Sequence, residues 1–286
     1  MAISDIFVGR SNELSQFNEI LKDPGGQVIL IVGHQGMGKT ILMDHLEKLV
    51  ERFSNGKSIR YRVLPSETPE TIMETILTDV QNASQKEAGF FDIKGQATKI
   101  KALLDALKIG NLIGALLRKP GLRTHEKFIA ALKLLSDRLS VDSRFIIFID
   151  PDPYLSTGSV SAYRTIAEEL PPKIKLVIAQ RPEDEINNDH DFTALPNLVR
   201  IPHEGLRPLD ERALHEFVDR ASPAVNCPKE IVLTAMAQYS GHPYEVAAAL
   251  QLLADGVQIA ALPFDPTPKK VATSQCNVYG IRGQMW

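Results

Sequence analysis

Cysteine is scarce in this chain, which has only Cys227 and Cys276 among its 286 residues. Two cysteines so far apart do not make the disulfide framework of a small secreted domain or the paired thiolates of a zinc site. The first residues also lack the basic start and the apolar core of a secretion signal. These absences predict a protein of a reducing compartment, and we expect it in the cytoplasm.

Long apolar runs and an excess of one charge are missing as well. The most apolar stretch, residues 102–117, contains Asp105, Lys108 and Asn111 and is too short to span a bilayer. The 32 Lys and Arg against 35 Asp and Glu leave a net charge of -3. This balance gives no general field that attracts nucleic acid or an anionic membrane, although it is compatible with a local basic patch.

Predicted strands and helices alternate over the first two thirds of the chain. The continuous apolar runs at 27–32 and 144–150 are typical of strands buried on both faces of a parallel sheet. Further strands are expected at 58–64, 175–180 and 198–201. Helices are expected at 11–21, 39–53, from 68 onward, 98–117, 126–139 and 161–170. The alternation predicts an α/β fold with a parallel sheet and crossover connections.

After residue 202 only helices are predicted, at 210–221, 228–239 and 243–254. We therefore expect an α/β domain over residues 1–204, a helical lid domain over 205–262 and a tail over 263–286. The tail matches no further domain. Two explanations stay open for it, namely the truncated start of another domain or a minimal module whose partners are separate chains.

A phosphate-binding loop is the firmest prediction. The pattern G-x-x-x-x-G-K-[ST], the Walker A motif, is matched in full by Gly33, His34, Gln35, Gly36, Met37, Gly38, Lys39 and Thr40. A predicted buried strand precedes this segment and a helix follows it, as the motif requires. The glycines let backbone N–H groups turn toward phosphate oxygens, and the helix start adds its positive end. Lys39 is expected on the β- and γ-phosphates and Thr40 on magnesium, with Ile41 next in the binding segment.

A magnesium-nucleotide site also needs a carboxylate at the end of a neighbouring strand. Asp150 meets this need because it directly follows the apolar run 145–149. The alternative is an aspartate that only caps the strand. For the catalytic base two alternatives stay open, because Pro151 stands where many such ATPases have an acid. Asp152 is the base, or hydrolysis of ATP to ADP and phosphate is slow and the protein works mainly as a binding switch.

The segment Phe7-Val8-Gly9-Arg10 resembles the opening motif of STAND NTPases and initiator-type AAA+ ATPases, although Ser11 replaces their usual acid. The resemblance implies that these residues help to build the adenine pocket. It continues with Arg181 at a predicted strand end, which implies a sensor of the γ-phosphate. Pro243 in Gly241-His242-Pro243 resembles the G-x-P motif of the lid and implies packing near the adenine.

Taken together, these motifs resemble an AAA+/STAND module, with ATP and magnesium expected between the α/β domain and the lid. No guanine-reading Asn/Thr-Lys-x-Asp motif is present in the sequence, which favours ATP over GTP. The resemblance implies a switch that couples the ATP/ADP state to assembly or signalling, with a nucleotide-dependent homo-oligomer or a protein partner. The alternative is an initiator- or transposition-type ATPase that assembles on DNA, which the weakly acidic charge does not favour. A non-hydrolysing nucleotide-binding scaffold is a third hypothesis.

One apolar stripe allows two interpretations. The predicted helix at 98–117 carries leucines and isoleucines at helical spacing, with several lysines and Arg118 around them. Such a stripe can bind a membrane surface or a partner, but stripes of this kind are more often buried. We therefore predict a helix that packs into the core. Among the arginines at predicted strands, such as Arg60 and Arg62, nothing in the sequence selects an intersubunit arginine finger.

Overall fold

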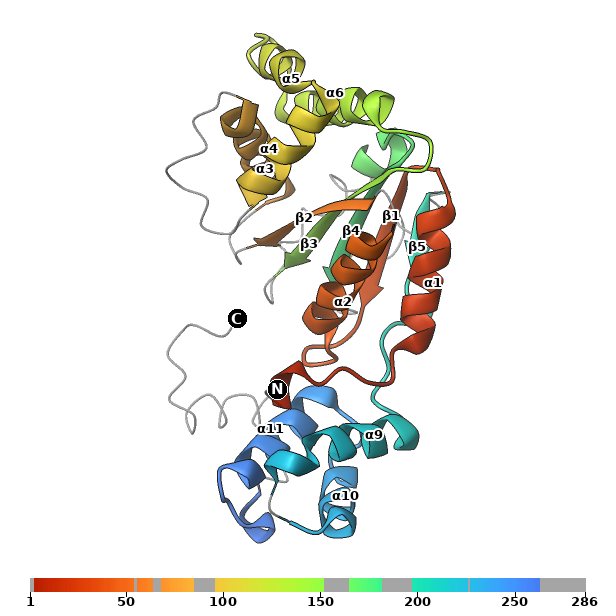
Figure 1. Ribbon diagram of the computed structural model, residues 1–286, viewed down its shortest axis with the longest axis vertical. Helices are drawn as coiled ribbons and strands as arrows, with labels where there is room; N and C mark the ends of the chain where they lie inside the picture. Colours follow the sequence, from red (N-terminus) through yellow and green to blue (C-terminus); the bar gives the residue numbers. More distant parts are fainter. Residues whose placement is uncertain are drawn as a thin grey trace. The chain divides into compact units, whose positions relative to one another are not determined.

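A computed structural model describes residues 3–53, 56–63, 68–84, 96–151, 165–181, 197–225 and 227–262 (Figure 1). The chain forms two compact units that are not continuous in sequence. The sheet unit comprises Asn12–His34 and Met43–Leu206. The lid unit comprises the residues up to Ser11, the segment Gln35–Leu42 and the residues from Arg207 onward.

The sheet unit contains a parallel sheet with the strand order β2-β3-β4-β1-β5. Its strands are β1 (Gln27–Val32), β2 (Gly56–Val63), β3 (Arg144–Pro151), β4 (Ile174–Gln180) and β5 (Leu198–Arg200). All seven residues of β4 are buried, as expected for a central strand covered on both faces. The order places β4 between β1, which leads into the predicted phosphate loop, and β3, which carries Asp150. The predicted α/β parallel fold is confirmed.

Helices cover both faces of this sheet. The elements are α1 (Ser11–Lys22), α2 (Lys39–Arg52), α3 (Pro69–Ser84), α4 (Gln96–Leu107), α5 (Gly110–Leu117) and α6 (Thr124–Arg138). Residues 165–169 are also helical. On one face, Phe17 of α1 contacts Phe148 of β3, with ring centroids 6.3 Å apart. On the other face, apolar residues of α3 to α6 form one core with β1, β2, β3 and β4.

The single helix predicted over 98–117 is wrong, because two helices occupy this segment. Helix α4 ends at Leu107, and Lys108 takes a left-handed backbone conformation with φ of 55°. The Ile109 N–H then donates to the carbonyl of Leu104 at 3.1 Å, which closes the turn before α5 begins at Gly110. Most of the apolar stripe is buried in the core, as predicted, whereas Leu112 is 48% exposed.

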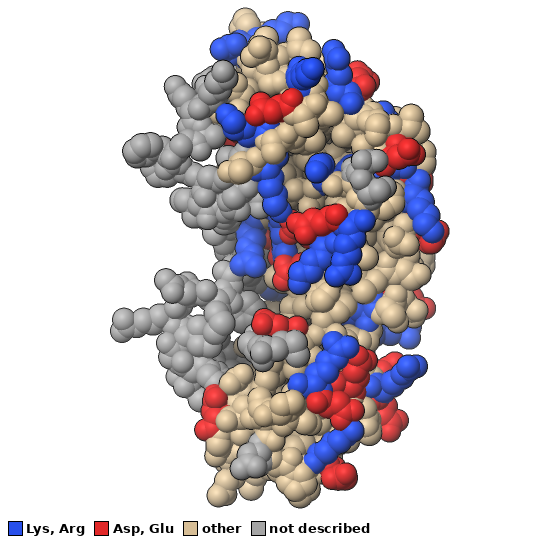
Figure 2. Space-filling model, in the orientation of Figure 1, with Lys and Arg blue, Asp and Glu red and all other residues tan. Residues whose placement is uncertain are grey.

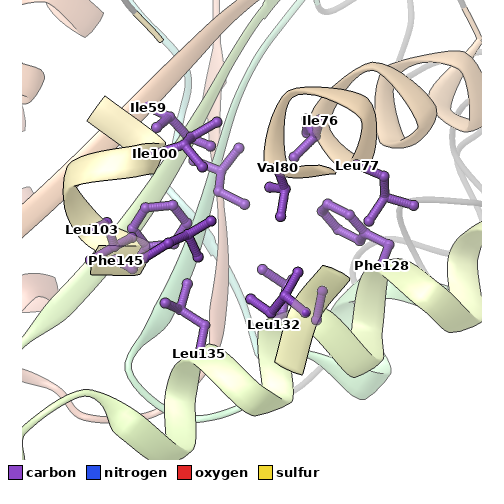
Figure 3. A pocket seen from close by; sticks show the side chains of 14 residues that line it. Ile59, Ile76, Leu77, Val80, Ile100, Leu103, Phe128, Leu132, Leu135 and Phe145 are labelled. Carbon is purple, nitrogen blue, oxygen red and sulfur yellow. The ribbon is translucent and has the colours of Figure 1, made fainter. Parts of the chain in front are cut away.

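The core beneath these helices has a small cavity of about 40 Å³ (Figure 3). Its lining is apolar throughout and comes from β2, β3 and the helices α3 to α6, including Ile59, Val80, Phe128 and Phe145. An apolar cavity of this size is expected to stay dry, and it is far smaller than a site for an organic ligand. We therefore regard it as a packing defect.

The lid unit is helical. It contains η1 (Ile3–Asp5), α9 (Glu211–Ala221), η2 (Ser222–Ala224), α10 (Lys229–Ala237), α11 (Pro243–Ala254) and η3 (Ile259–Ala261). Asp210 caps α9, since its carboxylate accepts from the Ala213 N–H at 2.7 Å. Ile3, Ile6 and Val8 join the core of these helices, so the start of the chain is part of this unit. No helix among the described residues is long and apolar enough to cross a membrane.

Candidate functional site

The predicted phosphate loop has the strand–loop–helix form that its motif requires. Strand β1 ends at Val32, and α2 begins at Lys39. Gly36 and Gly38 have φ values of 80° and 82°, a left-handed conformation that residues with a Cβ rarely adopt. Lys39, Thr40 and Ile41 form the first turn of α2 and are partly exposed, while His34 and Gln35 are exposed. Glycine at residues 36 and 38 is thus required by the backbone itself, and of these two Gly38 is a fixed glycine of the motif.

Three successive carbonyl groups of the loop accept hydrogen bonds from other segments of the lid unit, to which residues 35–42 themselves belong. Nε2 of His242 lies 3.1 Å from the Gln35 oxygen and must carry the proton in this bond, because a carbonyl only accepts. The remaining two bonds run from the Tyr244 N–H to the Gly36 oxygen at 3.2 Å and from Nη2 of Arg10 to the Met37 oxygen at 3.1 Å. In a trans peptide the N–H points opposite to the carbonyl. The carbonyls of residues 35 to 37 share their peptide groups with the N–H groups of residues 36 to 38. These three N–H groups therefore point away from Arg10, His242 and Tyr244.

The space around the loop differs on its two sides. A Cβ at Gly36 would lie 2.4 Å from Cε1 of His242 and 3.0 Å from Cβ of Tyr244, so this side is closed. A Cβ at Gly38 would meet no atom of the described residues within 4 Å. Turned N–H groups and open space beside Gly38 are what a phosphate group needs. The residues of the loop therefore fit a nucleotide phosphate.

The segment Phe7–Arg10 is fixed within the lid unit. Gly9 has a φ of 68°, and a Cβ there would lie 2.5 Å from Cβ of Ala213. The Phe7 carbonyl accepts from Arg220 at 3.1 Å, and Val8 is buried. Arg10 donates to the Arg207 carbonyl at 2.8 Å as well as to the loop. Arg10 thus links this motif to the phosphate loop, and its expected place at the adenine stays a prediction.

Pro243 is the first residue of α11, where its fixed φ suits a helix start. The preceding Gly241 has a φ of 72°, and the Leu209 N–H donates to its carbonyl at 2.7 Å. A Cβ at Gly241 would lie 2.1 Å from the Leu209 oxygen. The Gly241–Pro243 turn is therefore packed against the start of the lid, and it also sets the position of His242 on the phosphate loop.

In the sheet unit, Asp150 lies near the end of β3 and is 5% exposed. Its Oδ2 accepts from Nη2 of Arg60 on β2 at 2.6 Å. Arg60 is 8% exposed and also pairs with Asp44 of α2. Burial alone would lower the pKa of Arg60, but the two carboxylates raise it above its usual value. The residue predicted to bind magnesium is thus held by a permanently charged guanidinium.

Sequence reasoning did not select Arg60 or Asp44 as site residues. Arg60 could have been noticed because it is a charged residue at an inward-facing position of a buried strand. A buried charge of this kind requires a partner of opposite charge. Arg181 directly follows β4 and is partly buried, beside Gln180, whose carbonyl accepts from the Gly33 N–H at 3.1 Å. Asp152 lies outside the described residues.

The donor set suits magnesium rather than a protein-only metal cage. Within the part of the chain that the structure describes, no cluster of three or more His, Cys, Asp or Glu residues could hold a metal ion. Magnesium in nucleotide sites takes one or two protein oxygens and completes its shell with phosphate and water. The hydroxyl of Thr40 and the carboxylate of Asp150 are ligands of this kind.

Comparison with known proteins agrees with this architecture. The family model described as "AAA ATPase domain" matches residues 6–178. Among solved structures, Cdc6p from Pyrobaculum aerophilum matches with a TM-score of 0.51 and 16% sequence identity, over 88% of this chain. The chain spans only 64% of that structure's length, and at this identity the likeness shows the fold alone. No curated protein matches the chain.

Proposed function

The chain belongs to the AAA ATPase domain family, and on this premise we propose that it is an ATP-dependent switch of the STAND type. The observation that carries the proposal is the set of three loop carbonyls held by Arg10, His242 and Tyr244. The same three peptide groups whose N–H ends would bind phosphate present their carbonyl ends to Arg10, His242 and Tyr244, which belong to the same unit as the loop. A change at the phosphate therefore acts directly on lid contacts.

The nucleotide would be held by residues of the loop. The N–H groups of residues 36 to 38 and the Lys39 ammonium would bind the phosphates, and the Thr40 hydroxyl and Asp150 would hold magnesium. Bound magnesium would neutralise the charge that develops on the phosphates during hydrolysis. Arg181 would sense the γ-phosphate, and Phe7 to Arg10 with Pro243 would frame the adenine.

Switching follows from the shared peptide groups. Phosphate binding polarises the N–H ends of these peptides and strengthens the hydrogen bonds at their carbonyl ends, because linked hydrogen bonds reinforce one another. A ligand can shift a conformational equilibrium only through differential contacts in the two states. Loss of the γ-phosphate would change these contacts, and with them the ability to assemble with further copies or with a protein partner.

The test compares nucleotide binding with the response of the protein to it. Binding of fluorescent ATP and ADP analogues is measured together with protease sensitivity and assembly by light scattering. We expect Lys39→Ala to abolish binding of ATP. His242→Ala is expected to keep ATP affinity within about fivefold while it reduces the difference between the ATP and ADP states. His215→Ala, on the exposed face of α9, is the control.

The outcomes separate the hypotheses. Identical protease sensitivity and assembly in the ATP and ADP states of the wild-type protein would rule out a switch and favour a non-hydrolysing scaffold. Asp152→Asn separates the two explanations of turnover, because a lower ATPase rate identifies Asp152 as the base. An unchanged rate favours slow hydrolysis without it.

A second candidate function, assembly on DNA, is favoured by one observation. Residues 96–138, from α4 to the end of α6, contain nine Lys and Arg and three Asp and Glu, a net charge of +6 in a chain of -3. Figure 2 shows basic side chains over the region of α4 to α6. Within this segment, ion pairs join Lys99 to Glu47 and Lys133 to Glu169. A surface of this kind attracts phosphate backbones.

Filter binding to DNA across a salt series, with and without ATP, tests this candidate. If the protein assembles on DNA, binding is ATP-dependent and weakens steeply with salt. Lys119→Glu with Arg123→Glu should then reduce binding, whereas Arg212→Glu on α9 should leave it unchanged. Absence of DNA binding at low salt would exclude this candidate and leave the switch that acts on proteins.

A further inference from the structure

Asp150 and Asp44 share one guanidinium, that of Arg60. Arg60 lies opposite Phe148 in the register of β2 and β3, two positions before the pair Arg62 and Asp150. Side chains two positions apart on a strand share a face, so Arg60 reaches along one face of the sheet to Asp150. Its Nη2 donates to Oδ2 of Asp150 at 2.6 Å, and its Nη1 contacts Asp44 of α2.

We propose that Arg60 is a built-in counter-cation that neutralises Asp150 in the absence of magnesium and must transfer to Asp44 when magnesium binds. The proposal rests on the proposed nucleotide site and names a residue that sets its magnesium requirement. It assigns Arg60 as a positioning residue that acts through Asp150.

Burial explains why Asp150 needs a cation at all times. The carboxylate is 5% exposed, and an unpaired charge at this depth is strongly unfavourable. A lysine could lose its proton there, but an arginine stays charged under all physiological conditions. Arg60 therefore supplies a fixed positive charge, and magnesium must compete with it for the same carboxylate.

Asp44 makes the exchange feasible. It lies on α2, one helical turn after Thr40, and its side chain is 44% exposed. When Asp150 turns to magnesium, Arg60 keeps Asp44 as a partner and does not become an isolated buried charge. The two carboxylates thus have opposite effects on metal binding. Loss of Arg60 removes the competitor, whereas loss of the Asp44 charge removes the carboxylate that would hold Arg60 when Asp150 turns to magnesium.

The experiment measures the magnesium requirement of nucleotide binding. A fluorescent ADP analogue is titrated in EDTA and at a series of magnesium concentrations, and the concentration that gives half of the magnesium effect is determined. We expect Arg60→Gln to lower this concentration by about tenfold, the usual scale of an outer-shell change at a metal site. Asp44→Asn should raise it. Arg62→Gln makes the same charge change two residues further along β2, at an exposed position, and should leave it unchanged.

A second measurement follows the folded state. The melting temperature of Arg60→Gln should fall in EDTA and recover with magnesium and ADP, because the metal replaces the lost cation. If Arg60→Gln does not fold, Asp44→Asn decides, since its changed group is partly exposed. Two results would overturn the proposal. One is a half-maximal magnesium concentration for Asp44→Asn that is equal to or below that of the wild-type protein. The other is a half-maximal magnesium concentration for folded Arg60→Gln that is equal to or above that of the wild-type protein.

These failures differ from failure of the proposed function. If the wild-type protein binds no nucleotide with or without magnesium, the nucleotide site and the role of Arg60 both fall. If the wild-type protein binds nucleotide with a magnesium effect and the variants do not alter it, only the role of Arg60 falls.

Discussion

The imidazole of His242 lies against the phosphate loop, with Nε2 3.1 Å from the carbonyl oxygen of Gln35. The ring also fills the space that a side chain at Gly36 would need, because a Cβ there would lie 2.4 Å from Cε1. The turn before α11 and the loop before α2 therefore fit together only with glycine at residue 36. Gly36 and Gly38 have almost the same backbone conformation, but a side chain at residue 36 would also collide with His242.

Substitution of each loop glycine by alanine tests this difference. Both Gly36→Ala and Gly38→Ala place a Cβ on a left-handed residue, which costs about 1–2 kcal/mol of unfolding free energy. Gly36→Ala adds the collision with His242 and should cost about 1–3 kcal/mol more, the range for an overpacked site. Urea unfolding without nucleotide measures both values.

A double-substitution cycle isolates the contact. His242→Ala in the Gly36→Ala background should recover most of the additional loss, whereas in the Gly38→Ala background it should recover none. Equal losses in the two single variants would contradict the contact between the ring and the loop.

The loop could be predicted from sequence because its requirements are local. The loop lies between a strand and a helix, and the pattern specifies Gly33, Gly38, Lys39 and Thr40. The ion pair of Arg60 and Asp150 could not be predicted, since it joins residues 90 positions apart. It depends on the register of β2 against β3, which sets Arg60 opposite Phe148. A single sequence shows that Arg60 is charged within a strand but not which carboxylate it meets.

The fold shows the same division between local and distant causes. Strand β1 and helix α11 have the predicted bounds because apolar runs, a glycine and a proline mark their ends. The break at Lys108 was missed because apolar periodicity continues through it, from Leu104 to Ile113. What breaks the helix is a left-handed lysine, and propensity alone does not indicate such a residue. Its position is set by the packing of α4 and α5 against α3.

The turn before α11 gives a second stability prediction. Gly241 and Gly256 both have positive φ values, 72° and 89°. A Cβ at Gly241 would lie 2.1 Å from the backbone oxygen of Leu209, which cannot move without the chain. A Cβ at Gly256 would meet no atom within 4 Å in the part of the chain that the structure describes. Gly256→Ala should therefore lower the melting temperature slightly, by strain of about 1–2 kcal/mol. Gly241→Ala should cost about 4 kcal/mol or more, as exceptional substitutions do.

Far-UV circular dichroism during heating measures both changes. The matched pair controls for the loss of glycine flexibility in the unfolded chain, which both variants share. Similar melting temperatures for the two would contradict the close approach of residues 241 and 209.

The core cavity predicts that one added methyl group stabilises the sheet unit. Val80 faces the cavity from α3 (Figure 3). Val80→Ile should raise the unfolding free energy by up to about 0.8 kcal/mol, the value of one buried methylene. Val141→Ile is the matched control, because Val141 is 75% exposed and its added methyl gains no contacts. Urea midpoints measure both variants, and a stabilised Val141→Ile or a destabilised Val80→Ile would contradict the prediction.

Lys175 predicts how stability changes in alkaline solution. Its side chain is buried in β4 and donates to the Gly25 carbonyl at 2.8 Å and to Oε1 of Gln27. Burial lowers the pKa of Lys175 to about 8, an effect that Asp23 opposes and Arg144 reinforces. In the unfolded chain a lysine has a pKa of about 10.4. Between about pH 8 and pH 10.4 the unfolded chain binds more protons than the folded protein. The cost of burying the charged ammonium of Lys175, which is fully present below about pH 8, is therefore relieved as the pH rises.

The wild-type protein should therefore gain stability relative to Lys175→Met between about pH 8 and pH 10. The gain levels off above about pH 10, because there the lysine also loses its proton in the unfolded chain. In both proteins burial raises the pKa of Tyr239 to about 12, so the unfolded chain loses tyrosine protons first and the stability of each falls above pH 10. Lys175→Met removes the titrating group and keeps an unbranched side chain, and the difference of urea midpoints at each pH cancels all other groups. A difference that stays constant with pH would show that Lys175 keeps its ordinary pKa, and one that falls would contradict the burial of its charge.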